Sequence, residues 1–290
     1  MNASVNPKVL VLGATGMLGN AVLRVFADSV GWDVRGTARS AAGVRLLRED
    51  LREKVATGVD VENVDVLAAV LGAERPGVVI NCVGLVKQLS DAQDPLAALP
   101  VNAMLPHRLA RLCALVGARL VHVSTDCVFD GKRGSYSEAD APDAQDVYGR
   151  SKLLGEVDYP HAITLRTSII GHELASAHGL VGWFLAQQGG VRGFTKAVFS
   201  GLPTVELATV IRDHVLPHPA LHGLYHVSAQ PIDKHALLCL VAREYGRTTP
   251  ITPDDGLVID RSLDSSRFRA ATGYAAPPWP ELVRRMHAFG

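Results

Sequence analysis

The sequence predicts an α/β protein with a doubly wound parallel sheet and a smaller C-terminal subdomain. Two observations support this prediction. Between residue 8 and about residue 171, short runs rich in valine and isoleucine alternate with amphipathic segments, and a glycine-rich turn follows the first run. Most of the runs lack an alternation of apolar and polar residues, which is typical of strands buried on both faces of a parallel sheet. Such strands separated by helices indicate a doubly wound fold.

The expected elements follow one another regularly in the first part of the chain. Strands are expected at residues 8–12, 33–38, 55–61, 78–83, 119–124 and 162–170. Helices are expected at residues 17–29, 41–54, 64–73, 95–116 and 146–157. Further along, a strand is expected at residues 223–227, and helices at residues 180–188, 205–216, 234–245 and 279–289. We therefore expect a sheet domain at residues 1–171 and a smaller subdomain at residues 172–290, closely packed and with some crossing of segments.

The composition argues against several classes of protein. The 290 residues contain 29 lysines and arginines and 29 aspartates and glutamates, so the formal net charge is zero. The positive charge that is typical of a nucleic-acid-binding protein is missing. No apolar run approaches the ~18 residues of a membrane span. The 11 histidines form no metal-binding motif, so we expect no metal site.

The cysteines and the first residues bear on the compartment. Cys82, Cys113, Cys127 and Cys239 are widely spaced and contain no C-x-x-C pair, which is typical of reduced thiols. The first residues show no charged segment followed by an apolar stretch and a cleavage site. A cytoplasmic location is expected.

The glycine-rich turn after the first strand predicts a dinucleotide site of the Rossmann type. Its residues are Gly13, Ala14, Thr15, Gly16, Met17, Leu18 and Gly19, in a G-x-x-G-x-x-G pattern. Glycine allows a tight turn and a close approach of the backbone to a diphosphate, and the N-terminus of the following helix attracts the anion. Because the turn lies between a strand and a helix, we interpret it as a dinucleotide site and not as a purely structural turn.

The end of the second strand favours NADPH over NADH as the cofactor. An NAD site usually places an acid there to bind the ribose 2′-hydroxyl. Asp33 begins the strand instead, and Arg39 and Ser40 follow its end. An arginine and a serine can bind a 2′-phosphate. NADH stays open as an alternative, since Arg39 could also be a solvated surface residue.

The next two strand ends supply further candidates for cofactor contacts. Asp60 and Val61 close the third strand, where a side chain could reach the adenine. Asp60 could equally cap the following helix. Cys82, Val83 and Gly84 close the fourth strand beside the expected nicotinamide ribose, and they could equally belong to the core.

A tyrosine, a lysine and a threonine form the expected catalytic group. Only Tyr148 among the six tyrosines has a lysine four residues later, and this spacing places Tyr148 and Lys152 on one face of a helix. The ammonium could lower the pKa of the phenol and also reach the nicotinamide ribose. Thr125 ends the fifth strand, at the sheet edge where cofactor and substrate meet, and could bind the reacting oxygen. The group predicts hydride transfer to a carbonyl, with Tyr148 donating the proton.

These motifs together resemble the extended short-chain dehydrogenase/reductases, and among them the dTDP-4-dehydrorhamnose reductase group. The matching segments are residues 13–19, 60–61, 124–131, 148–152, 155–156, 166–168, 203–204, 206–207 and 263–266. The resemblance implies that Thr125, Tyr148 and Lys152 are catalytic. It implies that Asn102 helps to hold the active-site helix and a relay water, and that the protein forms a homodimer. It also implies that the C-terminal subdomain binds a sugar nucleotide, with Asp126, Ser168 and Thr204 near the substrate.

The sequence departs from that group where the sugar would bind. Ile169 replaces an aromatic residue, and Cys127 replaces a tyrosine. Lys87 and Gln88 lie just beyond the nicotinamide side of the sheet, where they could bind substrate or be solvated. These differences leave the sugar open and the hydride chemistry unchanged.

Three functions are therefore considered. The first is an NADPH-dependent reductase of the 4-keto group of a nucleotide-activated deoxy sugar, serving polysaccharide or glycosylated metabolite synthesis. The second is a sugar-nucleotide epimerase or dehydratase with tightly bound NAD, although Cys127 follows Asp126 where dehydratases have a second acid. The third is a non-catalytic regulatory subunit of the same fold. Such proteins often lose the tyrosine or the lysine, and both are present here.

Overall fold

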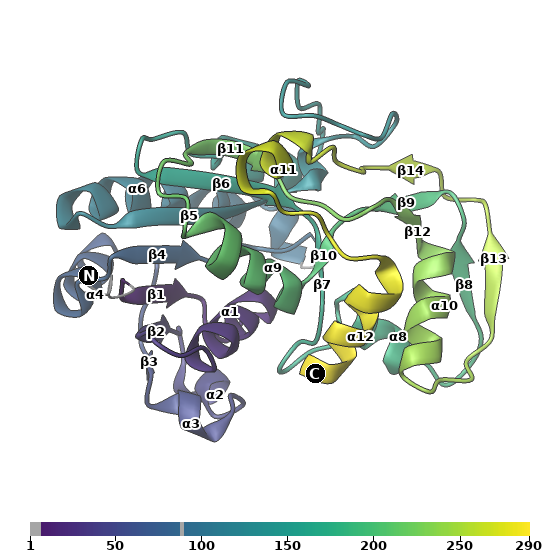
Figure 1. The fold of residues 1–290 in the computed structure, drawn as a ribbon, viewed down its shortest axis with the longest axis horizontal. Helices are drawn as coiled ribbons and strands as arrows, with labels where there is room; N and C mark the ends of the chain where they lie inside the picture. Colours follow the sequence, from purple (N-terminus) through teal and green to yellow (C-terminus); the bar gives the residue numbers. More distant parts are fainter. Residues whose placement is uncertain (1–6, 88–89) are drawn as a thin grey trace.

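The computed structural model describes residues 7–87 and 90–290, and its centre is a parallel sheet of seven strands (Figure 1). The strands lie in the order β11-β6-β5-β4-β1-β2-β3. Their bounds are β1 Val9–Leu12, β2 Val34–Thr37, β3 Val55–Ala56, β4 Val78–Asn81, β5 Arg119–Thr125, β6 Ala162–Thr167 and β11 Gly223–His226. From β1 the chain proceeds to one edge and then, from β4, to the other. The predicted doubly wound α/β fold is therefore confirmed.

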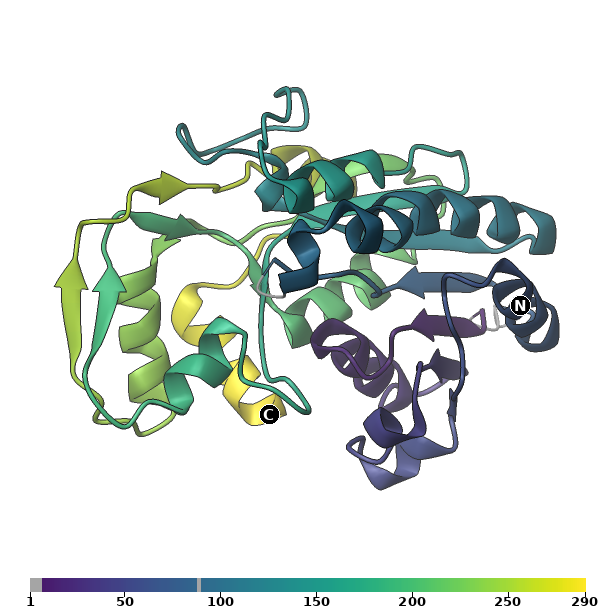
Figure 2. The same cartoon turned by 180° about the vertical axis from the view of Figure 1, so that it is seen from behind.

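Helices cover both faces of the sheet. In Figure 1 α1 (Met17–Ala27) and α9 (Thr204–Val210) lie in front of it, and Figure 2 shows α6 (Leu105–Val116) on the opposite face. The four residues of β1 are all buried, because both faces of the strand pack against helices. One core joins the sheet to α1 and α9, and a second joins it to α6 and α4 (Val64–Glu74).

The C-terminal part of the chain adds small sheets beside the central one. The further strands are β7 Ile169–Ile170, β8 Val191–Phe194, β9 Ala197–Phe199, β10 Leu202–Pro203, β12 Ile232–Asp233, β13 Ile251–Asp254 and β14 Ile259–Asp260. The remaining α-helices there are α8 Leu180–Leu185, α10 Lys234–Glu244, α11 Ser266–Thr272 and α12 Trp279–Phe289. β11 returns to the central sheet, where it pairs with β6. The division near residue 171 stays a prediction, and β11 is a segment that crosses it.

Two expected elements are interrupted in the structure. The helix expected at residues 41–54 is two short helices, α2 Ala41–Val44 and α3 Glu49–Arg52. Arg48 between them has a ψ of 137°, which breaks the helix and lets Leu47 and Leu51 both enter the core. The strand expected at residues 162–170 breaks at Ser168, whose carbonyl accepts a hydrogen bond of 2.9 Å from the Leu202 amide. β7 therefore pairs with β10 instead of continuing in the central sheet.

The helical run expected at residues 95–116 contains a wider turn. It comprises α5 Pro95–Ala98, a π-helical segment Leu99–Met104, and α6. Pro106 has no N–H to bond the carbonyl of Asn102, so a regular α-helical ladder cannot continue there. Such π segments are frequent at functional sites. The third strand is also shorter than expected, since Gly58 turns the chain with a φ of +75°.

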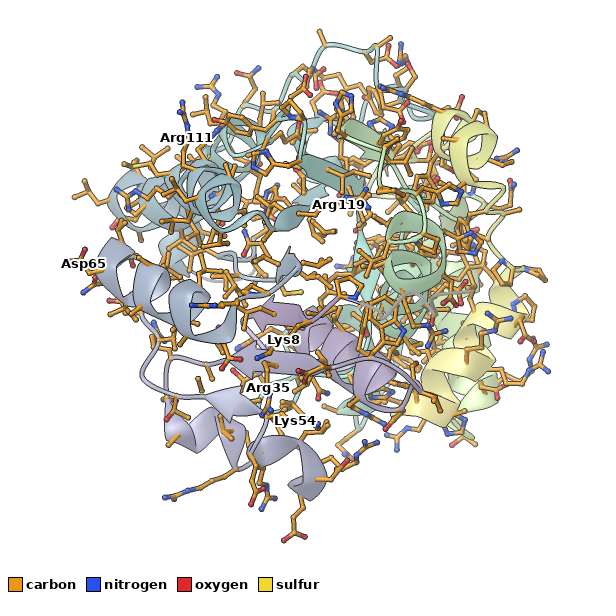
Figure 3. The ribbon with its side chains drawn as sticks, turned by 60° about the vertical axis from the view of Figure 1, so that its left-hand side comes forward. Lys8, Arg35, Lys54, Asp65, Arg111 and Arg119 are labelled. Atoms are coloured by element: carbon orange, nitrogen blue, oxygen red, sulfur yellow. The ribbon has the colours of Figure 1, made fainter. Side chains whose placement is uncertain are left out.

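The two ends of the parallel strands differ. Figure 3 labels Lys8, Arg35 and Lys54 near the end of the sheet where β1, β2 and β3 begin. The opposite end, where the strands finish, carries the glycine-rich turn and the large cavity described below. In the described part of the chain, no helix is long and apolar enough to cross a membrane.

Candidate active site

The glycine-rich turn leads from β1 into α1 with no room for side chains at two of its glycines. Gly13 has a φ of +78°, and a Cβ there would lie 2.9 Å from Cγ2 of Val83. A Cβ on Gly19 would lie 2.0 Å from the Gly13 carbonyl oxygen. Gly16 caps α1 and has no side chain that could accept a hydrogen bond from the amides of the first turn. This arrangement fits a diphosphate, which can approach the backbone closely and accept those amides.

A cavity of about 710 Å³ opens beside this turn and continues across the carboxyl ends of β4 and β5. Many of the residues expected at the cofactor and substrate line it. They are Thr15, Gly16, Met17, Leu18, Cys82, Val83, Gly84, Lys87, Thr125, Asp126, Tyr148, Lys152 and Ser168. The turn from β1 and the helix carrying Tyr148 therefore face one shared space, as a site for two reactants requires.

Other expected residues lie outside the cavity lining. Arg39 and Ser40 follow β2, and both are exposed. The Arg39 guanidinium makes no hydrogen bond or ion pair with the described side chains. At the other end of the strand, Oδ1 of Asp33 lies 3.6 Å from Nε of Arg35. Asp60 accepts the amide of Glu62 at 3.0 Å, and the helix cap is Asn63 instead.

The segment after β4 is joined to helix α7 (Val147–Leu154) at two points. Asn102 accepts the Leu85 amide at 2.9 Å, and its own amide lies 3.2 Å from the Ser151 hydroxyl on α7. Lys87 forms an ion pair of 2.6 Å with Asp146. Asp146 also caps α7 by accepting the Gly149 amide at 2.7 Å. Asn102 thus holds the helix but does not line the cavity, and Gln88 lies outside the described residues.

Tyr148 and Thr125 are close enough to interact, and burial dominates their electrostatics. Burial raises the pKa of the Tyr148 phenol, the nearby Cys127 adds to this, and a hydrogen bond with Thr125 opposes it. Thr125 itself accepts the Cys127 amide at 3.1 Å. Burial outweighs the lowering that was expected from Lys152, so the phenol pKa is raised overall. Tyr148 is therefore protonated at neutral pH and suited to donate a proton.

Lys152 lines the cavity and is otherwise buried. It donates a hydrogen bond of 2.8 Å to the Val123 carbonyl, and burial lowers its pKa to about 8 while Glu156 opposes this shift. Thr125, Tyr148 and Lys152 can therefore supply a hydroxyl, a phenolic proton and a cation to one bound molecule.

Two basic residues of the cavity are not predicted from the sequence. Lys234 begins α10, and Arg261 follows β14. Both line the cavity, and both lower the pKa of Asp126, which burial raises above its ordinary value. No motif marks either residue, because distant segments bring them to the site. Thr204, which was expected near the substrate, is buried against Gly171 and does not line the cavity.

The described residues contain no group of three or more His, Cys, Asp or Glu side chains placed to hold a metal ion. Among the histidines, His214 and His218 are joined by a bond of 2.9 Å from the His218 ring to the His214 carbonyl.

Comparisons with known proteins identify a family. The sequence model of the RmlD substrate binding domain family matches residues 7–287. Methionine adenosyltransferase 2 subunit beta of Mus musculus is 32% identical over 314 residues, which cover 95% of this chain and 88% of that protein. The dTDP-4-dehydrorhamnose reductase of Mycobacterium tuberculosis is 40% identical over 125 residues, which cover 36% of this chain and 41% of that protein.

Solved structures share the fold at low sequence identity. The dTDP-4-dehydrorhamnose reductase of Bacillus anthracis, solved in complex with NADP, superimposes with a TM-score of 0.80 at 21% identity and covers 100% of both chains. The enzyme WbmG of Bordetella bronchiseptica, in complex with NAD and UDP, gives a TM-score of 0.77 at 17% identity, covering 100% of this chain and 95% of that chain.

Proposed function

Because the chain belongs to the RmlD substrate binding domain family, we propose that it is an NADPH-dependent reductase of the 4-keto group of a nucleotide-activated deoxy sugar. One observation carries this proposal: Thr125, Tyr148 and Lys152 face the same cavity as the N-terminus of α1. The relatives named as dTDP-4-dehydrorhamnose reductases, and the one solved with NADP, support the same activity.

Different residues of the site carry out different parts of the proposed reaction. When bound, the nicotinamide supplies the hydride for the carbonyl carbon. Thr125 holds the carbonyl oxygen, and Tyr148 donates its phenolic proton to that oxygen as negative charge develops. Lys152 provides a positive charge at the site, which favours the phenolate left on Tyr148 after the transfer. Gly13, Gly16 and the first turn of α1 hold the diphosphate of the cofactor, and Arg39 with Ser40 holds its 2′-phosphate.

The substrate occupies the part of the cavity away from α1. Lys234 and Arg261 face Asp126 there, and the two cations suit the diphosphate of a sugar nucleotide. The Asp126 carboxyl and the Ser168 hydroxyl suit sugar hydroxyl groups. The apolar side chains of Val198, Phe199 and Ile259 line the same region.

A panel of nucleotide 4-ketosugars tests the proposal. NADPH oxidation is measured for the wild type, for Tyr148→Phe and for Tyr159→Phe, whose hydroxyl contacts His107 outside the cavity. We expect turnover with at least one ketosugar, a loss of about a hundredfold or more in Tyr148→Phe, and no change in Tyr159→Phe. Cofactor affinity should be equal in all three proteins. Unchanged turnover in Tyr148→Phe would refute the mechanism.

A regulatory subunit is the second candidate, and one observation favours it. The similarity to methionine adenosyltransferase 2 subunit beta extends over 95% of this chain. In this case the protein would bind a methionine adenosyltransferase catalytic subunit and alter its kinetics. Co-elution with that subunit in gel filtration, together with no turnover of any ketosugar, would establish this function in place of the reductase.

A further inference from the structure

A buried histidine connects the strand that ends in Thr125 to the strand that ends beside the glycine-rich turn. His122 lies in the middle of β5, directly opposite Asn81 at the end of β4. Neither side chain is more than 1% exposed. Nδ1 of the histidine lies 3.1 Å from Nδ2 of the asparagine.

The hydrogen-bond partners determine the form of the His122 ring. Oδ1 of Asn81 accepts the Val83 amide at 3.1 Å, so the asparagine presents its NH₂ group to His122. Nδ1 must therefore accept, which requires a neutral ring with its proton on Nε2. Burial keeps the pKa of His122 well below its ordinary value, and Lys152 and His107 act in the same direction. The ring is thus neutral and held in one tautomer.

The Nε2–H group of His122 has no partner among the described residues. It is fully buried, and an unpaired buried donor is destabilising. Leucine would fill similar space without an unpaired Nε2–H group, but it would leave the buried Asn81 NH₂ group without its acceptor. Packing alone therefore does not explain a histidine here, whereas the bond from Nδ1 to Asn81 does.

The bond to Asn81 continues to the glycine-rich turn. Asn81 fixes the backbone of Val83, and Val83 packs against Gly13, where a Cβ would lie only 2.9 Å from the valine methyl. The Cys82 amide also donates to the Leu12 carbonyl at 3.1 Å. Both Cys82 and Val83 line the cavity. A shift of Asn81 would therefore move the cavity wall and the turn together.

We propose that His122 is a positioning residue for the dinucleotide site, acting through Asn81 and Val83 on the wall next to Gly13. The inference rests on the proposed function, because it assumes that the cavity beside α1 binds NADPH. Substitutions that remove or keep the acceptor at Nδ1 can separate this role from packing. In His122→Leu the acceptor is lost and the volume is kept, whereas in His122→Asn the amide oxygen can replace Nδ1 at the cost of a smaller side chain.

The experiment measures NADPH affinity by fluorescence titration and stability by thermal unfolding. We expect His122→Leu to bind NADPH about tenfold more weakly, the effect of one lost positioning hydrogen bond, with an unfolding midpoint near that of the wild type. His122→Asn should bind NADPH nearly as the wild type and unfold at a lower temperature. Thr164→Val is the matched control, since Thr164 lies opposite His122 in β6 and its hydroxyl, among the described residues, bonds only to Val157. It should lose stability and keep its affinity.

Two results would overturn the inference. If His122→Leu binds NADPH like the wild type, or if affinity follows the unfolding midpoint in all three variants, His122 has only a structural role. A wild type that binds neither NADPH nor NADH would refute the proposed function as well. Normal binding by the wild type with an unaffected leucine variant would refute this inference alone.

Discussion

The ammonium of Lys152 lies 2.8 Å from the carbonyl oxygen of Val123, two residues before Thr125 in the same strand. This bond attaches helix α7 to the end of β5 and fixes the distance between the elements that carry Tyr148 and Thr125. It also places the lysine in a buried position, where the charged form is disfavoured.

Burial of Lys152 should make the proposed reduction sensitive to alkaline pH. Its pKa is lowered to about 8, so the cation predominates below that pH and is lost above it. We expect kcat/KM for ketosugar reduction to fall as the pH rises above about 8, because the neutral lysine no longer favours the phenolate of Tyr148. Lys152→Met should be about a hundredfold slower and should lack this alkaline limb. A wild-type profile that stays flat to pH 10 would contradict the role of the lysine.

Arg39 should decide between the two nicotinamide cofactors. It is exposed at the end of β2 and free of ion pairs with the described residues, so it can bind a 2′-phosphate. Arg39→Ala should raise KM for NADPH about ten- to a hundredfold, the value of a charge-assisted bond, and leave KM for NADH unchanged. Arg35→Ala is the control, because Arg35 pairs with Asp33 at the beginning of the same strand. An equal effect of Arg39→Ala on both cofactors would exclude a 2′-phosphate contact.

Lys234 should contribute to substrate affinity and not to cofactor affinity. Lys234 lines the cavity and lowers the pKa of the Asp126 carboxyl. Lys234→Met removes the charge and keeps the aliphatic stem, so we expect KM for the sugar nucleotide to rise about tenfold with an unchanged Kd for NADPH. Lys196→Met is the matched control, since Lys196 pairs with Asp255 and is not part of the cavity lining. A change in the Kd for NADPH would place Lys234 at the cofactor instead.

The sheet and the glycine-rich turn could be predicted from the sequence because local patterns specify them. Runs such as residues 78–81 are buried on both faces, so they contain only apolar residues until Asn81, and their order along the chain determines the winding. Glycine is needed at positions 13 and 19 because their backbones lie so close to neighbouring atoms that a Cβ would collide with them. These features depend on near neighbours in sequence.

Other parts of the site depend on contacts that no local pattern reveals. Lys234 and Arg261 reach the cavity from segments more than 80 residues beyond Tyr148. The Lys152 pKa depends on burial by the surrounding strands and helices, whereas the sequence shows only its spacing from Tyr148. The break at Ser168 likewise results from pairing with Leu202, which a periodicity over residues 162–170 cannot indicate.

A buried ion pair behind the site should be important for stability. Arg166, 2% exposed, donates to both carboxylate oxygens of Glu156 at 2.9 and 2.5 Å, and the Ser124 hydroxyl donates to the same carboxylate at 2.7 Å. Glu156→Gln leaves the buried guanidinium without a counter-charge, so we expect a loss of about 3–5 kcal/mol in the free energy of unfolding, measured by urea denaturation. Asp255→Asn, which breaks the exposed pair with Lys196, should cost about 0–1 kcal/mol.

Glu156→Gln should also shift the pH profile of the reaction. Glu156 raises the pKa of Lys152 against the effect of burial, so its neutralisation lowers that pKa further. The alkaline limb of kcat/KM in Glu156→Gln should therefore begin at a lower pH than in the wild type, in whatever fraction of the protein remains folded. Arg166→Lys keeps the charge of Glu156, so it should lose stability with a smaller movement of the limb. If both variants lose stability and neither moves the limb, Glu156 has no influence on Lys152.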